Sequence, residues 1–148
     1  MRIGITCGDL VFLDDIRIFS NGHHFNVFLW YHFFEKCGYD PIFLSNTMNN
    51  NIIHYENTKY NIININSIYE NESNLKKIKL DYVLFVGLTS CVLSSLLKKH
   101  HIKRIYSMLG NVYSNDLETV VFDKGYNKGV IRDAYDEIWI SPHFAYSL

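Results

Sequence analysis

The segment from Leu80 to Gly87 constrains the fold most strongly, because it is apolar on both faces of an extended chain. A strand that buries both faces is typical of a parallel sheet, since crossover helices cover each side of such a sheet. Similar short runs, rich in branched and aromatic residues, recur along the chain between turn residues. The predicted strands are Arg2 to Cys7, Asp40 to Ser45, Tyr60 to Ile65, Leu80 to Gly87, Arg104 to Leu109 and Glu137 to Ser141.

Helical segments alternate with these strands. One helix is predicted from His23 to Cys37 and another from Cys91 to about Lys99, and Pro142 suits the first turn of a third. Residues 46–60 are polar and are predicted to form a loop. The 148 residues are one domain's worth of chain. The alternation therefore predicts a single α/β, Rossmann-like domain over residues 1–148, with a parallel sheet and helices on both faces.

The first predicted helix has a wide apolar face. At roughly 100 degrees per residue, its apolar side chains span an arc of about 200 degrees. The arc consists of Val27, Leu29, Trp30, Tyr31, Phe33, Phe34 and Cys37. One face of a sheet covers less than this, so part of the arc is expected to face a second domain or another copy of the chain. Val27 and Phe34 are predicted to lie in that outer part.

Charge and cysteine content exclude several classes of protein. Lys and Arg number 14 and Asp and Glu 15, and this net charge of -1 disfavours nucleic-acid binding. The three cysteines form no CxxC pair, which disfavours a disulfide framework and a cysteine zinc site. Asp9, Asp14 and Asp15 stand where a secretion signal needs apolar residues, and no apolar run approaches the roughly 20 residues that span a bilayer. We therefore expect a cytoplasmic protein without a membrane span.

Common sequence signatures of nucleotide and metal sites are absent. No GxGxxG follows the first predicted strand, no GxxxxGKS/T forms a P-loop, and no GxSxG forms a nucleophile elbow. The histidine pairs at 23–24 and 100–101 are adjacent, so their rings point apart. We therefore expect neither a metal nor a cofactor in this domain. The abundance of Ile, Asn, Tyr, Phe and Lys indicates an A/T-rich coding genome, such as that of a large DNA virus or a parasite.

Small and polar residues follow four of the predicted strands. In a doubly wound sheet, ligands bind beyond the carboxyl ends of the strands, where glycine lets the main chain approach a ligand closely. The candidate substrate-binding residues at these positions are Gly8, Asp9, Gly87, Thr89, Ser90, Gly110, Asn111, Ser141 and His143. A purely structural role is the alternative for each group, because strand ends need turn residues in any case.

The start of the first helix adds further candidates. His23 and Asn26 follow Asn21-Gly22 and lie within the otherwise apolar arc, beside the expected ligand edge. Polar groups aimed inward need hydrogen-bond partners, which a bound substrate can supply. His23 is therefore a candidate catalytic residue, and Asn21, Gly22 and Asn26 are candidate substrate-binding residues. A helix cap or a local hydrogen bond accounts for these residues equally well.

Four patches, spread over most of the chain, form a pattern together. They are Gly4-Ile5-Thr6, Ser20-Asn21-Gly22 with Asn26 and Phe28-Leu29, Asp81 to Gly87, and Tyr135 to Pro142. In this pattern Asn-Gly, three residues and a second Asn open the first helix. The chain thereby resembles an uncharacterised bacterial family with glycosyltransferase-B-like architecture.

The resemblance implies a function. Enzymes of this architecture have two Rossmann-like domains facing one cleft; the N-terminal domain generally binds the acceptor and the C-terminal domain the nucleotide sugar. The chain would then be the N-terminal, acceptor-side domain, and by itself it is expected to be inactive. Its expected partners are a sugar acceptor and a second Rossmann-like domain in the same or a separate chain. His23 would act as general base, and Asn26, Thr89, Asn111 and His143 would position the sugar.

Two alternatives remain open at this point. The chain could be a half-enzyme that needs a separate partner chain carrying the donor site. It could also be a Rossmann-like interaction module without catalytic activity. A reading frame that continues past Leu148 into a second α/β pattern would favour the two-domain enzyme over both.

Overall fold

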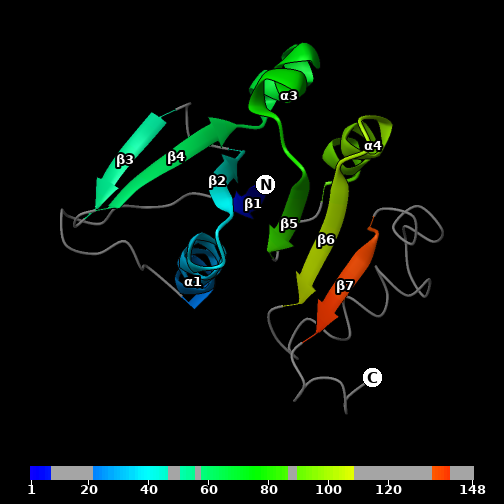
Figure 1. Cartoon of the computed structure of the whole chain (residues 1–148). Coiled ribbons are helices and arrows are strands. Elements are labelled where there is room, and N and C mark those ends of the chain that lie inside the picture. Colours follow the sequence, from blue (N-terminus) through cyan, green and yellow to red (C-terminus); the bar gives the residue numbers. More distant parts are fainter. Residues whose placement is uncertain (8–21, 47–50, 56–57, 87–89, 109–134, 141–148) are drawn as a thin grey trace.

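The described strands form one seven-stranded sheet with helices on both faces (Figure 1). The computed structural model describes residues 1–7, 22–46, 51–55, 58–86, 90–108 and 135–140. Its elements in chain order are β1 (Arg2–Cys7), α1 (Gly22–Lys36), β2 (Asp40–Ser45), β3 (Asn51–Tyr55), β4 (Thr58–Asn64), α2 (Asn66–Glu70), α3 (Ser73–Ile78), β5 (Tyr82–Val86), α4 (Cys91–Lys99), β6 (Lys103–Met108) and β7 (Glu137–Ile140).

The strand order is that of a doubly wound sheet. The strands stand in the order β3-β4-β2-β1-β5-β6-β7, and all neighbours pair in parallel except β3, which runs antiparallel to β4 at the edge. When β3 is left out and the six parallel strands are numbered 1 to 6 along the chain, their order across the sheet is 3-2-1-4-5-6. This order is typical of Rossmann domains. The predicted Rossmann-like α/β fold is confirmed.

The observed elements depart from the predicted ones between β2 and β5. The expectation that residues 46–60 form a loop is wrong, because β3 and the start of β4 lie there and pair as a hairpin. β3 pairs with β4 through its main chain at the edge of the sheet, where a polar sequence is common and gives little strand signal. The short helices α2 and α3 follow β4, where the sequence pattern predicts no helix.

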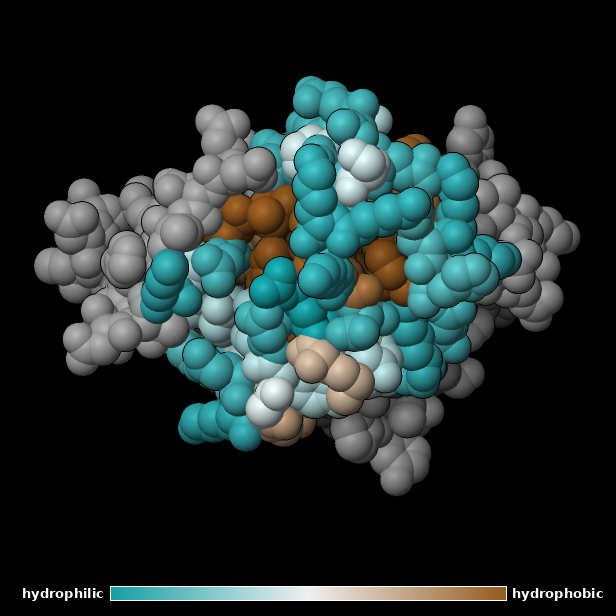
Figure 2. All heavy atoms as spheres, turned by 45° about the horizontal axis from the view of Figure 1, so that its top comes forward, coloured by the Kyte–Doolittle hydropathy of each residue, from teal (hydrophilic) through white to brown (hydrophobic). Residues whose placement is uncertain are grey.

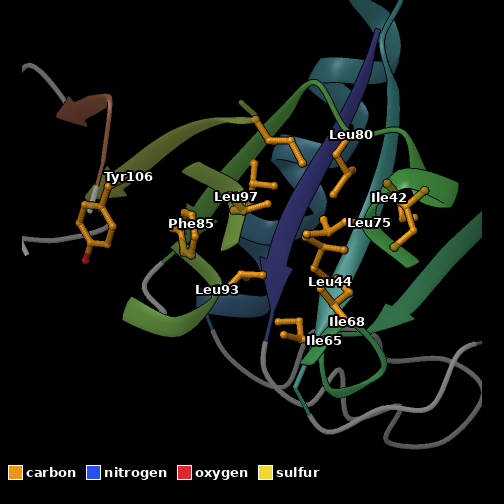
Figure 3. Close-up of a cluster of buried hydrophobic side chains, with 13 residues drawn as sticks. Ile42, Leu44, Ile65, Ile68, Leu75, Leu80, Phe85, Leu93, Leu97 and Tyr106 are labelled. Carbon is orange, nitrogen blue, oxygen red and sulfur yellow. The ribbon is translucent and has the colours of Figure 1, made fainter. Parts of the chain in front are cut away.

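Two apolar clusters, one on each face of the sheet, form the core. The cluster on the α1 face contains Ile3, Ile5, Cys7, Val27, Phe28, Tyr31, Phe34, Phe43, Tyr60, Ile62, Leu84, Val86 and Ile105. The cluster beneath α2, α3 and α4 contains Ile42, Leu44, Ile65, Ile68, Leu75, Ile78, Leu80, Val83, Phe85, Leu93, Leu97, Ile102 and Tyr106 (Figure 3). Alternate residues of β5 join opposite clusters, as the two-residue period of a strand requires. This explains why its sequence is apolar throughout.

The residues of the α1 apolar arc that pack against the sheet differ from those expected. Val27 and Phe34 are 0% and 4% exposed and belong to the core, so the prediction that they face another domain or copy is wrong. The outward part of the arc is instead formed by Leu29 and Phe33, which are 49% and 52% exposed. Because the arc is wider than the stripe that packs on the sheet, the sequence does not fix which of its edges is buried.

The outer surface is largely hydrophilic where Figure 2 displays it. With the top of Figure 1 turned forward, hydrophobic atoms are visible mainly in recesses between hydrophilic side chains. The large apolar side chains that are exposed in the described residues are Met1, Leu29, Phe33, Tyr69, Val92 and Ile138. Among the helices that the structure describes, none is long and apolar enough to cross a membrane.

An ion pair between a buried arginine and a partly exposed aspartate attaches β7 to β6. The Arg104 side chain is 5% exposed, and its Nη2 and Nε donate to the two carboxylate oxygens of Asp136 over 2.8 and 3.0 Å. Its Nη1 donates to Ser94 Oγ over 3.2 Å. The hydrogen bond from Arg104 lowers the pKa of Asp136 below its ordinary value. The pair thus fixes the start of the edge strand β7 against the start of β6.

Candidate functional site

The carboxyl ends of the parallel strands form one edge of the sheet, which we call the carboxyl edge. Its switch point lies between β1 and β5, because the chain continues from β1 to β2 on one side and from β5 to β6 on the other. Ligands of doubly wound domains bind at this point. α1 follows β1 and leads back to the start of β2, so its first turn also lies at the carboxyl edge. The candidate site is built from these elements.

A side chain bridges β1 and β5 at the switch point. The main-chain pairing of these strands runs from Ile3 opposite Tyr82 to Ile5 opposite Leu84. Beyond it, the Val86 N–H donates to the buried Thr6 Oγ1 over 3.0 Å. A hydroxyl thus replaces a main-chain acceptor where the two strands end, and it satisfies an N–H that would otherwise be buried without a partner.

Ser90 begins α4 at the carboxyl end of β5. Its Oγ accepts a hydrogen bond from the Leu93 N–H over 3.2 Å, so Ser90 caps the N-terminus of α4. The same Oγ lies 3.0 Å from the hydroxyl of Tyr69, which α2 carries and which is 40% exposed. Ser90 therefore joins α2 to α4 at the carboxyl edge. Its proposed contact with substrate stays a prediction.

The candidates at the start of α1 are only partly described. Gly22 and His23 form the first residues of α1, and the His23 side chain lies outside the described part. Asn26 is half-buried in the second turn, one residue before the fully buried Val27. The topology brings Asn26 to the same edge as Thr6 and Ser90, and its role in binding a substrate stays a prediction.

The other sequence-predicted site residues lie outside the described residues. Each follows the end of a strand or precedes α1 along the chain, and its role stays a prediction. They are Gly8, Asp9, Asn21, Gly87, Thr89, Gly110, Asn111, Ser141 and His143.

Three polar residues at this edge are not singled out by the sequence pattern. Thr6 and Ser107 lie within predicted strands, and Tyr69 lies in the unpredicted helix α2. A hydroxyl inside an apolar strand carries no distinctive sequence signal, because its importance depends on the neighbouring strand. For Thr6, a polar side chain one residue from the end of a buried strand is the available clue.

Neither unusual pKa values nor a metal-binding cluster identifies a site among the described residues. Burial raises the pKa of Tyr106 to about 12, and burial with nearby Glu35 raises that of Tyr31 to about 12, so both phenols stay protonated at neutral pH. Within the described residues, no group of three or more His, Cys, Asp or Glu side chains could hold a metal ion.

An open groove of about 410 Å³ lies at the opposite edge, where α4 ends and β6 begins. It is lined by Lys98, His101, Ile102, Lys103, Arg104 and Asp136. Arg104 is neutralised by Asp136, and Lys103 pairs with Glu137. Cations at a helix C-terminus also complement the helix dipole. The lining therefore has a structural explanation, and the groove lies away from the switch point.

Comparison with known proteins identifies a family. The family described as Protein of unknown function (DUF2827) matches residues 3–148, almost the whole chain. No curated protein and no solved structure matches the sequence. The chain therefore belongs to the DUF2827 family.

Proposed function

We propose that this chain is the acceptor-binding, N-terminal domain of a glycosyltransferase with glycosyltransferase-B architecture. A second Rossmann-like domain, in the same polypeptide or in a partner chain, would bind the nucleotide-sugar donor. The acceptor would lie across the carboxyl edge, at the switch point between β1 and β5.

The observation that carries this proposal is the location of the patches that resemble the glycosyltransferase-like family. Gly4-Ile5-Thr6 lies in β1, Gly22 and Asn26 lie at the start of α1, and Tyr82 to Val86 forms β5. Segments far apart in the sequence thus meet at the switch point, where a doubly wound sheet binds its ligand. Three of the four patches thus adjoin the switch point, and the fourth contains the edge strand β7.

The proposed chemistry is the transfer of a sugar to an acceptor hydroxyl. The acceptor oxygen forms the new bond to the anomeric carbon, and the bond to the nucleoside diphosphate breaks with its electron pair. The acceptor proton passes to His23 as general base, a role worth about 10²–10⁴-fold in rate. Asn26, Thr89, Asn111 and His143 would hydrogen-bond the acceptor and hold it in line for transfer.

The proposal is tested by giving the purified 148-residue chain both classes of substrate. We expect UDP-, GDP- and dTDP-sugars to undergo neither hydrolysis nor transfer, because the residues that hold the donor belong to the second domain. At least one sugar from a panel of methyl glycosides should bind and stabilise the fold by about 1.4 kcal/mol at ten times its Kd. Nucleotide release and thermal unfolding are the two measurements.

The outcomes separate the proposal from its alternatives. Turnover of a nucleotide sugar by the chain alone would contradict an acceptor-side domain. The absence of stabilisation by every sugar would favour an interaction module without carbohydrate binding. Transfer that appears only after a separate donor-binding chain is added would identify the half-enzyme form of the same function.

A further inference from the structure

The groove of about 410 Å³ where α4 leads into β6 has a basic lining (Figure 1). Its cations are Lys98, Lys103 and Arg104, His101 adds an imidazole, and Asp136 supplies a carboxylate. Sites for small molecules have volumes of about 300–1,000 Å³, so the groove is large enough for such a ligand. Its charge favours an anionic one. We call it the α4 groove.

The acidic residue of the lining does not cancel this charge. The Asp136 carboxylate accepts from Nη2 and Nε of Arg104 over 2.8 and 3.0 Å, so these two charges offset each other. Lys103 forms an ion pair with Glu137, but an ammonium group has three donors, and the Lys103 side chain is 43% exposed. The remaining charge of the lining comes from Lys98, which lies in the last turn of α4.

Two donor side chains of the α4 groove are unused within the described part of the chain. Lys98 and His101 are exposed, and neither side chain forms a hydrogen bond or an ion pair with a described residue. The favourable position of Lys98 at a helix C-terminus does not consume its N–H groups. The carbonyl groups of Leu97 and Lys98 already accept from the N–H groups of Ile102 and His101. An ammonium and an imidazole are therefore available to a ligand.

The main chain at His101 indicates that its side chain has a use. The two hydrogen bonds that end α4 form a Schellman motif, and His101 occupies the position after the cap. Its φ is 57°, in the left-handed region where glycine is the usual residue. A residue with a Cβ atom is strained there. A histidine at this position lowers stability relative to glycine, and it places an imidazole in the groove.

We propose that the α4 groove binds the phosphate group of a small phosphorylated molecule. Lys98 and His101 donate to the phosphate oxygens, Lys103 adds positive charge, and the rest of the molecule lies along the groove. A phosphate monoester has a charge of about −1.5 to −2 at neutral pH and three acceptor oxygens, so it suits several donors better than a carboxylate does. This site is at the opposite edge of the sheet from the switch point and does not depend on the proposed function.

The first test titrates the ¹⁵N-labelled chain with phosphate monoesters at constant ionic strength. The panel contains AMP, glucose 6-phosphate and glycerol 3-phosphate, with adenosine, glucose and glycerol as controls. We expect saturable amide shifts at His101, Ile102 and Lys103 with at least one ester and none with the controls. Lys98→Met should weaken its Kd about 3- to 10-fold, as expected for one lost hydrogen bond. Lys76→Met is the matched control, because Lys76 is an exposed lysine in the last turn of α3 and does not line the groove. Its Kd should equal that of the wild type.

Two results would overturn the inference as a whole. One is the absence of saturable shifts with every ester, and the other is an equal loss of affinity in the two lysine variants. Inorganic phosphate is titrated in parallel to distinguish the two sources of a phosphate group. If it binds as tightly as every ester, the assignment to a phosphorylated small molecule is wrong.

The second test separates ligand binding from a structural role of His101. His101→Gly removes the strain at a φ of 57°, so its Tm should equal or exceed that of the wild type, while its Kd for the ester should weaken about 3- to 10-fold. Lys79 has the same φ at the end of α3 and does not line the groove. Lys79→Gly should also keep or raise the Tm, but with unchanged Kd. An unchanged Kd in His101→Gly would overturn the role of His101, whatever its Tm.

Discussion

Phe34→Ala is expected to lower the free energy of unfolding by about 3–5 kcal/mol, as is typical for removal of a buried aromatic ring. Phe34 is 4% exposed, and its ring stacks on Trp30 at a centroid distance of 5.6 Å. It also packs near Tyr39 and Trp139, at 5.7 and 6.3 Å. The change would therefore open a cavity between α1 and the sheet. Urea unfolding followed by circular dichroism measures the effect.

The adjacent residue provides the matched control. Phe33 is 52% exposed, and its main aromatic neighbours are Trp30 and Phe34. Phe33→Ala should therefore cost less than about 1 kcal/mol. Equal losses for the two variants would contradict the orientation of α1. So would a Phe34→Ala chain that keeps its stability but changes its oligomeric state.

The second large effect is expected at the ion pair that fixes β7. Asp136→Ala leaves the guanidinium of Arg104, whose side chain is 5% exposed, without its carboxylate partner. We expect a loss of about 2–4 kcal/mol in the free energy of unfolding, since an unpaired buried charge is costly. Asp40→Ala removes the carboxylate of the exposed pair with Arg2 and should cost no more than about 1 kcal/mol. Similar losses in the two variants would contradict the role given to Arg104.

The same pair predicts a dependence of stability on pH. Arg104 lowers the pKa of Asp136, so the folded chain binds this proton less readily than the unfolded chain. The contribution is then fully present above the ordinary pKa near 3.8 and is lost as the pH falls through the lower, folded pKa. Unfolding measured between pH 5 and pH 2 should show a smaller acid-induced loss in Asp136→Ala than in the wild type.

The sequence predicts those parts of the fold whose signals are local. β1 and β2 have the predicted bounds, and Gly38, with φ of 81°, ends α1 where a glycine is expected. Errors arise where the outcome depends on distant partners. β3 exists through its pairing with β4, and the buried stripe of α1 depends on how the helix rotates over the sheet.

Some residues of the candidate site can likewise be predicted from local sequence, and others cannot. Ser90 follows a predicted strand and precedes a predicted helix, so its place at the carboxyl edge can be read from the sequence. Thr6 becomes a candidate only through register, because its hydroxyl lies beside the Val86 N–H of the neighbouring strand. A sequence pattern identifies the ends of strands, but it does not identify which buried hydroxyl has a partner.

The most direct test of the account is to map where a sugar binds. The ¹⁵N-labelled chain is titrated with the methyl glycoside that stabilises it best, and amide shifts are followed by NMR. We expect the largest changes at the carboxyl edge, at Cys7, Val86 and Ser107, and little change at Arg2 and Lys103 on the opposite edge. Shifts confined to the opposite edge, or no shifts with any sugar of the panel, would contradict the assignment of the switch point as an acceptor site.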